Sequence, residues 1–155
     1  MTVNRCGAAV AEVEPDDHGL TISVDFPEPA AGVTSIDGTA TLTNTSRRRV
    51  AGITGISPVV TLSRGGIVVW TTNAQDLPAQ TVDLDPGESM TYPAWLDAVD
   101  CESAAASDRD LTTTARPLGP GAYQVSALID FSPATSADSY VFEVVSGPSS
   151  TLVLK

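Results

Sequence analysis

The chain has 155 residues, 42% of them hydrophobic and 17% charged, which suits a single domain whose folding buries roughly two thirds of the unfolded surface. The 19 acidic residues outnumber the 8 basic ones, and the net charge of −11 disfavours nucleic acid and anionic membrane surfaces as partners. No apolar run approaches the roughly 18 residues of a membrane-spanning helix, so we expect no membrane insertion.

Apolar and polar residues alternate through most of the chain, as they do in half-buried strands. Three stretches lack this alternation and are expected to be irregular, namely 1–19, 27–35 and 97–117. The alternation itself predicts strands at 20–26, 36–43, 59–62, 67–70, 90–92, 123–131, 140–144 and 151–154.

Within this series, 59–62 and 67–70 flank Ser63-Arg64-Gly65-Gly66 and are predicted to form a hairpin. The row from Tyr123 to Phe131 is the clearest inward-facing one, and the next strand has Tyr140, Phe142 and Val144 as its apolar row.

Seven or eight strands without intervening helices predict an all-β protein, an immunoglobulin-like antiparallel β-sandwich. We expect one domain over 1–155, with the sandwich core at 20–145 and a C-terminal edge segment at 146–155. The long loop 97–117 either forms one helical turn at its three alanines or is a mobile loop, and the sequence does not indicate its role.

The two cysteines, Cys6 and Cys101, are predicted to form a disulfide, the alternative being two unrelated buried thiols. A bridge of this span stabilises a fold by about 4–5 kcal/mol in the chain-entropy model. Disulfides persist in oxidising compartments, so we expect an extracytoplasmic protein, secreted or at the cell surface, whose leader is not in this chain. MTVNRCGAAV itself does not have the pattern of a signal peptide.

Tyr123 follows Leu118-Gly119-Pro120-Gly121 at the start of the strongest strand. This is the arrangement of a tyrosine corner, in which the phenol bonds to the backbone a few residues upstream. We therefore expect a structural role for Tyr123.

A second Leu-x-Pro-Gly sequence lies in Asp83-Leu84-Asp85-Pro86-Gly87-Glu88 and places three carboxylates close together. A calcium loop would need a regular series of oxygen ligands, which does not follow here. Pro and Gly at these positions favour a turn, with the three carboxylates facing water.

His18 is the only histidine and lies beside Asp16 and Asp17. A Ser-His-Asp site would have to use it, but no nucleophile motif accompanies it. A zinc site would have to combine it with cysteines that are better used in a bridge. We expect a solvated turn residue, and we find no residue set that indicates catalysis, a metal or a cofactor.

Three consecutive arginines, Arg47, Arg48 and Arg49, follow the possible glycosylation sequon Asn44-Thr45-Ser46. We expect a solvated loop between two strands, whose charges protect a sheet edge. The alternative is an interaction loop, which would contact an acidic partner or a protease. Trp70 and Trp95 are expected in the core or on a sheet face.

The order of several motifs resembles the intracellular proteinase inhibitor (BsuPI) domain. The motifs are TLTNTS at 41–46, GIVVW at 66–70, LDPGES at 84–89, Trp95, and LGPGAYQV at 118–125. The resemblance covers roughly 36–130 and implies an immunoglobulin-like sandwich and inhibition of a subtilisin-type protease. The chain departs from the family at 57–61, where an aromatic-rich stretch is replaced by SPVVT, and in its two cysteines, which indicate export.

The sequence therefore favours a non-enzymatic bacterial domain that acts in protein binding, assembly or spacing, with an unidentified protein partner. Inhibition of a protease through an exposed loop is the alternative. The oligomeric state does not follow from the sequence.

Overall fold

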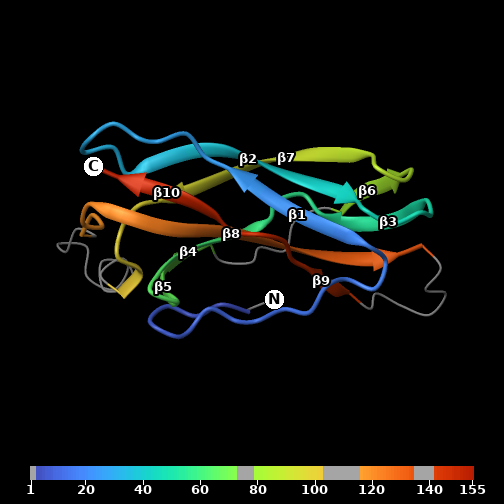
Figure 1. Cartoon of the computed structure of the whole chain (residues 1–155), viewed down its shortest axis with the longest axis horizontal. Coiled ribbons are helices and arrows are strands. Elements are labelled where there is room, and N and C mark those ends of the chain that lie inside the picture. The colour runs from blue at the N-terminus through green and yellow to red at the C-terminus, as the bar shows by residue number, and fades with distance from the viewer. Residues whose placement is uncertain (1–2, 73–78, 103–115, 135–141) are drawn as a thin grey trace.

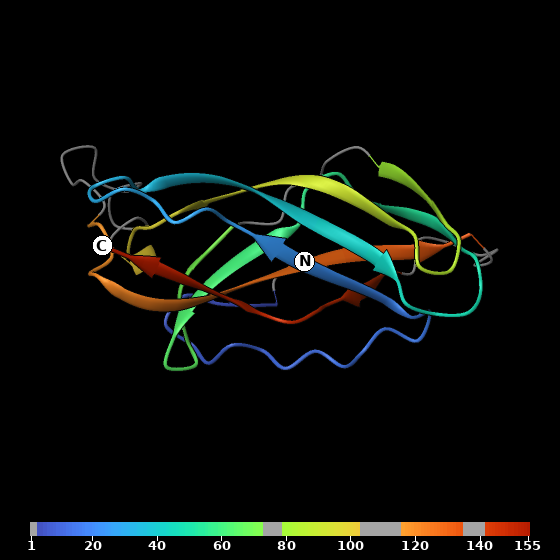
Figure 2. The ribbon, with the colours of Figure 1, turned by 45° about the horizontal axis from the view of Figure 1, so that its top comes forward.

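The computed structural model describes residues 3–72, 79–102, 116–134 and 142–155, and its fold is an all-β sandwich of two antiparallel sheets (Figures 1 and 2). The described residues form ten strands: β1 (Leu20–Asp25), β2 (Ser35–Asn44), β3 (Val50–Gly55), β4 (Val59–Arg64), β5 (Ile67–Thr71), β6 (Ala79–Leu84), β7 (Ser89–Asp97), β8 (Gly121–Pro133), β9 (Glu143–Val145) and β10 (Ser150–Leu154). The predicted all-β antiparallel sandwich is thus confirmed, with more strands than the seven or eight expected.

The smaller sheet has the order β1-β2-β7, so β1 and β7 are its edges. Its register places Ile22 opposite Leu42, and Leu42 opposite Met90. Side chains alternate between the two faces of a strand, so the apolar residues of β1 and β2 point inward while their threonines and serines point outward. The alternation predicted at 20–26 and 36–43 is confirmed.

The larger sheet is built on β8, the longest strand, which runs along the length of the molecule in Figure 1. Its first part pairs with β4 and β10, and its last part pairs with β3 and β9. β5 lies beyond β4 and β6 lies beyond β3. β3 pairs with residues 131–133 of β8 and β4 with residues 124–128, and residues 56–58 separate the two strands.

The core lies between the sheets and contains the inward rows of both. The predicted row on β8 is confirmed, since Tyr123, Val125, Ala127, Ile129 and Phe131 are all buried. The largest side chains that are fully buried are Phe131, Ile22, Leu42, Leu62, Leu96, Ile129, Leu152, Val60, Val68, Val82, Val125 and Val145.

The prediction for 140–144 is wrong about which residues face the core. Val145 on β9 is the buried residue, whereas Phe142 is 43% exposed and Val144 is half-buried. Val145 pairs with Ile129 of β8, and this register turns Val145 toward the core. Tyr140 lies outside the described residues.

The N-terminal segment is irregular, as predicted, but it follows the outer edge of β5. The amides of Gly7 and Val10 donate to the carbonyls of Val68 and Gly66, each at 2.9 Å, and the Val68 amide donates back to Ala8. Figure 1 shows this dark blue segment beside β5. Because it takes up hydrogen-bonding groups of an edge strand, it protects that edge from pairing with another chain.

Within the described part of the chain, no helix has the length and apolar character that crossing a bilayer requires.

Candidate functional site

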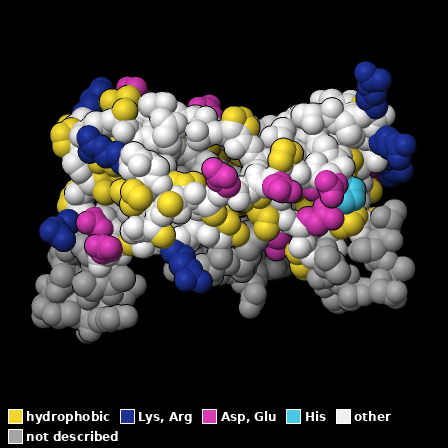
Figure 3. All heavy atoms as spheres, turned by 60° about the horizontal axis from the view of Figure 1, so that its bottom comes forward, with side chains coloured by type: hydrophobic (Ala, Val, Ile, Leu, Met, Phe, Trp, Pro, Cys, Tyr) yellow, Lys and Arg dark blue, Asp and Glu magenta, His cyan; other side chains and the backbone are white. Residues whose placement is uncertain are grey.

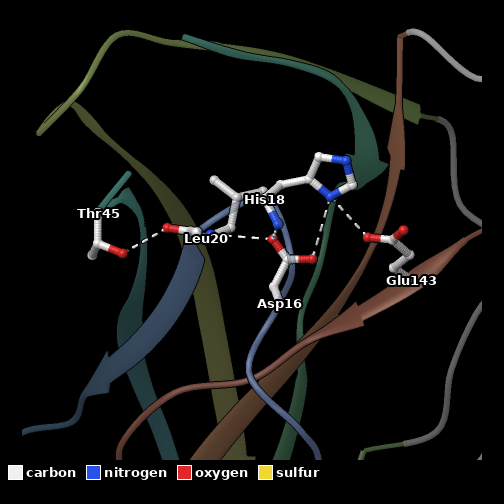
Figure 4. A network of polar contacts seen from close by, with 6 residues as sticks. Asp16, His18, Leu20, Thr45 and Glu143 are labelled. Atoms are coloured by element: carbon white, nitrogen blue, oxygen red, sulfur yellow. Dashed lines mark hydrogen bonds and ion pairs between the residues drawn. The ribbon is translucent and has the colours of Figure 1, made fainter. Parts of the chain in front are cut away.

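Asp16, His18 and Glu143 come together at one end of the sandwich, although 125 residues separate His18 from Glu143. Asp16 and His18 lie in the turn that enters β1, and Glu143 is the first residue of β9, so the cluster joins the two sheets (Figure 4). In Figure 3 the one histidine lies at the surface with acidic side chains beside it.

The turn at Asp16 explains how its carboxylate is held. The Gly19 amide donates to the Asp16 carbonyl at 3.1 Å, which closes a β-turn with Asp in its favoured first position. Oδ2 of Asp16 accepts from the backbone amides of His18 and Leu20, both at 3.1 Å. Its other oxygen, Oδ1, is buried and has no hydrogen-bond partner, and the side chain as a whole is only 1% exposed.

The His18 ring lies between two carboxylates. Its Nδ1 is 3.0 Å from Oε2 of Glu143 and 3.7 Å from Oδ1 of Asp16. The ring also makes an edge-to-face contact with Phe131, with ring centroids 5.6 Å apart. The side chain is 33% exposed, so it is partly solvated as expected, but it also contacts two carboxylates. The sequence does place it in a turn, but not beside a carboxylate from the far end of the chain.

A cavity of about 330 Å³ opens beside this cluster, between the turn that enters β1 and the connection from β9 to β10. It is lined by Pro15, Asp16, Gly19, Leu20, Thr21, Thr45, Ser146 and Gly147. Thr45 fixes the turn on this side, because its hydroxyl and its amide both donate to the carbonyl of Gly19, at 2.7 and 2.8 Å.

The arginine loop lies near the same end of the molecule. Arg47, Arg48 and Arg49 are all exposed. Arg49 makes a two-pronged ion pair with Asp83, in which Nε and Nη2 donate to Oδ1 and Oδ2 at 2.6 and 2.5 Å. These hydrogen bonds lower the pKa of the Asp83 carboxyl and raise the pKa of Arg49.

Asn44, which is fully buried, holds the loop from within. Its Nδ2 donates to the carbonyls of Arg48 and Leu84, at 2.7 and 3.0 Å, and its Oδ1 accepts from the amide and hydroxyl of Ser46. An amide that is buried and fully bonded cannot receive a glycan in the folded protein, so the sequon at Asn44 has a structural use.

The carboxylates of 83–88 do not converge. Gly87 has φ +82° in the predicted turn, the Glu88 side chain accepts from the Asp85 amide at 2.9 Å, and Asp83 pairs with Arg49. All three carboxylates are exposed, as the sequence predicts for a turn.

Tyr123 is buried and its hydroxyl donates to the carbonyl of Gly119 at 2.7 Å, four residues upstream. The same hydroxyl accepts from Nη1 of Arg64 at 3.2 Å, and the Arg64 guanidinium lies 5.1 Å from the centre of the tyrosine ring. This is the geometry that a tyrosine corner requires.

The predicted disulfide between Cys6 and Cys101 is present, with the two Cα atoms 6.0 Å apart. It ties the N-terminal segment to the residues that follow β7. Most of the predicted loop 97–117, namely 103–115, lies outside the described residues. At its two ends the Asp100 amide donates to the Arg116 carbonyl at 2.8 Å.

The two tryptophans meet at one side of the sandwich, with ring centroids 5.4 Å apart in an edge-to-face contact. Trp70 on β5 is buried, as expected for a core residue. Trp95 is not in the core, because it points outward from the edge strand β7 and is 44% exposed.

No family model matches the chain, and no curated protein matches it. Among solved structures, it is similar to a putative ApaA protein from Bordetella pertussis, with 16% identity, a TM-score of 0.50, and coverage of 92% of this chain and 98% of that one. It is also similar to a β-glucosidase from Listeria innocua (17% identity, TM-score 0.36, 83% of this chain) and to a protein from Archaeoglobus fulgidus (10% identity, TM-score 0.37, 87% and 96% of the two chains).

The chain spans only 16% of the length of that β-glucosidase. The likeness to the ApaA protein, at 16% identity and a TM-score of 0.50, shows the fold alone.

Proposed function

We propose that the chain is a non-enzymatic, extracytoplasmic domain that binds another protein through the edge strand β7. The observation that carries this proposal is the exposed Trp95, which leans on the buried Trp70. Rigid aromatic side chains on a surface are the commonest anchors of protein–protein interfaces, because they bury a large area at little cost in conformational entropy.

The position of β7 also supports the proposal. β7 lies at the end of the order β1-β2-β7, as an edge strand that pairs with β2 on one side. Its outward residues Thr91, Pro93 and Trp95 are all exposed. The disulfide supports the location, since such bridges persist in oxidising compartments and are rare in the cytosol.

Capture of proteins from the envelope and secreted fractions of the source organism tests the proposal. Wild-type chain and two variants, Trp95→Ala and Ser23→Ala, serve as bait. Ser23→Ala is the control, because it removes an exposed, outward side chain of β1, the other edge strand of the same sheet. We expect one protein to be enriched by wild type and Ser23→Ala and to bind Trp95→Ala roughly tenfold or more weakly. Equal capture by Trp95→Ala would exclude this surface.

A separate experiment tests the proposed extracytoplasmic location. Alkylation of free thiols in intact cells, before lysis, records whether Cys6 and Cys101 are bridged in their natural compartment. A bridged pair is the expected result. Two alkylated thiols would place the chain in a reducing compartment and refute the extracytoplasmic assignment.

Protease inhibition of the BsuPI type is the second candidate. The loop 45–49 favours it, because the exposed Arg47 and Arg48 sit on a backbone that Asn44 holds in one conformation. Inhibitors that bind proteases tightly present such pre-organised loops. Titration against a subtilisin-like and a trypsin-like protease, with Arg48→Ala as the loop variant, tests it. Cleavage of the loop without inhibition at micromolar concentrations rejects this candidate.

A further inference from the structure

We propose that Asp16, His18 and Glu143 form a binding site for one divalent transition-metal ion, for which zinc is the best match. Each residue offers one ligand atom, and the three atoms lie within 4.8 Å of one another. This inference is independent of the proposed protein binding, since the three residues lie away from Trp95 on other elements.

The buried oxygen of Asp16 is the observation that points to a ligand. Its side chain is 1% exposed, and Oδ1 has no hydrogen-bond partner although it faces Nδ1 of His18 (Figure 4). A buried carboxylate oxygen without a donor is costly, and native proteins rarely retain one without a reason. A metal ion between Asp16 and His18 would satisfy it.

The distances fit such an ion. Zinc binds imidazole nitrogen and carboxylate oxygen at roughly 2.0–2.2 Å, which puts the ligand atoms of a tetrahedron about 3.4 Å apart. The observed separations from Nδ1 of His18 are 3.0 Å to Glu143 and 3.7 Å to Asp16. All three ligand atoms lie within 4.8 Å of one another, and the Glu143 side chain, which is 37% exposed, has room to rotate toward an ion.

A single proton on Nδ1 of His18 cannot pair with both carboxylates, whereas a metal ion can. One N–H at Nδ1 can donate well to a single acceptor, and Glu143 at 3.0 Å is the nearer one, so Oδ1 of Asp16 stays unpaired. A divalent cation accepts lone pairs from all three atoms and neutralises both carboxylates. The imidazole favours zinc and its neighbours in the transition series over calcium and magnesium, which prefer oxygen ligands.

The surroundings hold the ligands in place. Two backbone amides fix Oδ2 of Asp16, and the ring of Phe131 supports the imidazole. Supporting contacts of this kind orient the ligands in known metal sites. Three protein ligands leave a coordination position for water, as in open zinc sites. A bound ion would connect the turn before β1 to β9 and so join the two sheets.

Calorimetric titration of zinc chloride into the untagged, metal-stripped chain tests the proposal. We expect one zinc ion per chain, and at least tenfold weaker binding in His18→Ala and in Glu143→Ala. Asp17→Ala is the matched control, because it removes one exposed carboxylate next to the site without removing a ligand. Its affinity should stay within about twofold of wild type.

Three results would overturn the proposal. They are no zinc binding by the wild type, equal loss of affinity in Asp17→Ala and Glu143→Ala, and calcium binding as tight as zinc binding. The second and third would show diffuse attraction to acidic residues. Circular dichroism of each variant confirms that it is folded.

Because His18 is the only histidine, nitrogen NMR of the imidazole gives a second, independent readout. Zinc should shift the resonance of Nδ1, the nitrogen that faces both carboxylates, by far more than that of Nε2. A larger shift at Nε2 would contradict this geometry even if zinc binds.

Discussion

The backbone of Gly147 lies against the carbonyl of Ile22, so closely that a Cβ at Gly147 would overlap the carbonyl oxygen. At this point the connection between β9 and β10 touches the edge strand β1, and the Ile22 amide donates to the Ser146 carbonyl at 3.2 Å. The two sheets of the sandwich are thus joined along this edge by direct backbone contact. The φ of Gly147 is not in the left-handed region, so its backbone conformation does not require glycine. Glycine is required because a side chain would overlap the Ile22 carbonyl.

We therefore expect Gly147→Ala to lower the free energy of unfolding by about 1–3 kcal/mol or more, since backbone atoms have to move to admit the methyl group. Urea unfolding measures the change. Gly119→Ala is the matched control, because a Cβ there meets nothing within 4 Å. Similar midpoints for Gly147→Ala and Gly119→Ala would show that this edge can open without cost.

Tyr123→Phe should lower the free energy of unfolding by about 1–2 kcal/mol, because it leaves the Gly119 carbonyl without its donor and Nη1 of Arg64 without an acceptor. Comparing the urea unfolding of Tyr123→Phe with that of Arg64→Met separates the contributions of the two hydrogen bonds. A loss in Arg64→Met as large as in Tyr123→Phe would assign the effect to the arginine. Unchanged stability in Tyr123→Phe would remove the structural role.

Replacing Cys6 and Cys101 by serine should cost on the order of 4–5 kcal/mol in the chain-entropy model, because the bridge closes a loop with a sequence separation of 95. Urea unfolding of the double variant measures the loss. Hydrogen exchange gives a local readout, since the amides of Gly7 and Val10 are bonded to β5 and should exchange faster once the tether is gone. Protection that stays at the wild-type level would mean that the segment docks without the bridge.

The strands that the sequence predicts well are those whose inward positions hold large apolar residues, as Ile22 and Leu42 do. β3 has Gly52 and Thr54 at buried positions, so its alternation is faint, and the ring of Phe131 fills the space above Gly52. β6 has only Val82 and Leu84 buried. Such strands are determined by their neighbours in the sheet and not by their own residues.

The candidate site likewise could not be predicted from its local sequence alone. Asp16 and His18 lie two residues apart in the sequence, but the contacts of His18 with Glu143 and Phe131 depend on how the turn packs against the larger sheet. Glu143 has no motif around it, and it reaches His18 only because β9 pairs with the end of β8. A cluster whose members lie 125 residues apart becomes visible only once the register of β8 is known. The one local signal was an acidic pair beside a lone histidine.

Arg49→Gln should raise the pKa of the Asp83 carboxyl toward its ordinary value of 3.8, because the hydrogen bonds from Arg49 lower it in the folded chain. The pair stabilises the fold above the unfolded pKa of Asp83, and that contribution is lost as the pH falls through the lowered, folded pKa. Carbon NMR titration of Asp83 measures the shift. Arg48→Gln removes the same charge without the contact, and it should leave the Asp83 titration nearly unchanged.

The burial of Tyr92 affects how the free energy of unfolding changes at alkaline pH. Its buried ring raises the pKa of the phenol above 10.0, and the hydrogen bond with the Thr54 hydroxyl, at 2.7 Å, opposes the shift only in part. The unfolded chain then loses this proton at a lower pH than the folded chain does. The stabilising effect of neutral Tyr92 is therefore complete below about pH 10 and is lost as the pH rises through the folded pKa.

We expect the free energy of unfolding of wild type to fall above pH 10, and Tyr92→Phe to fall less steeply, by up to about 1.4 kcal/mol per pH unit for one proton. At neutral pH the variant should lose only about 1 kcal/mol, from the bond to Thr54. Absorbance titration at alkaline pH follows the same group, because the chain has three tyrosines and the late-titrating phenol should disappear in Tyr92→Phe. A late-titrating phenol that persists in the variant would assign the raised pKa to another tyrosine.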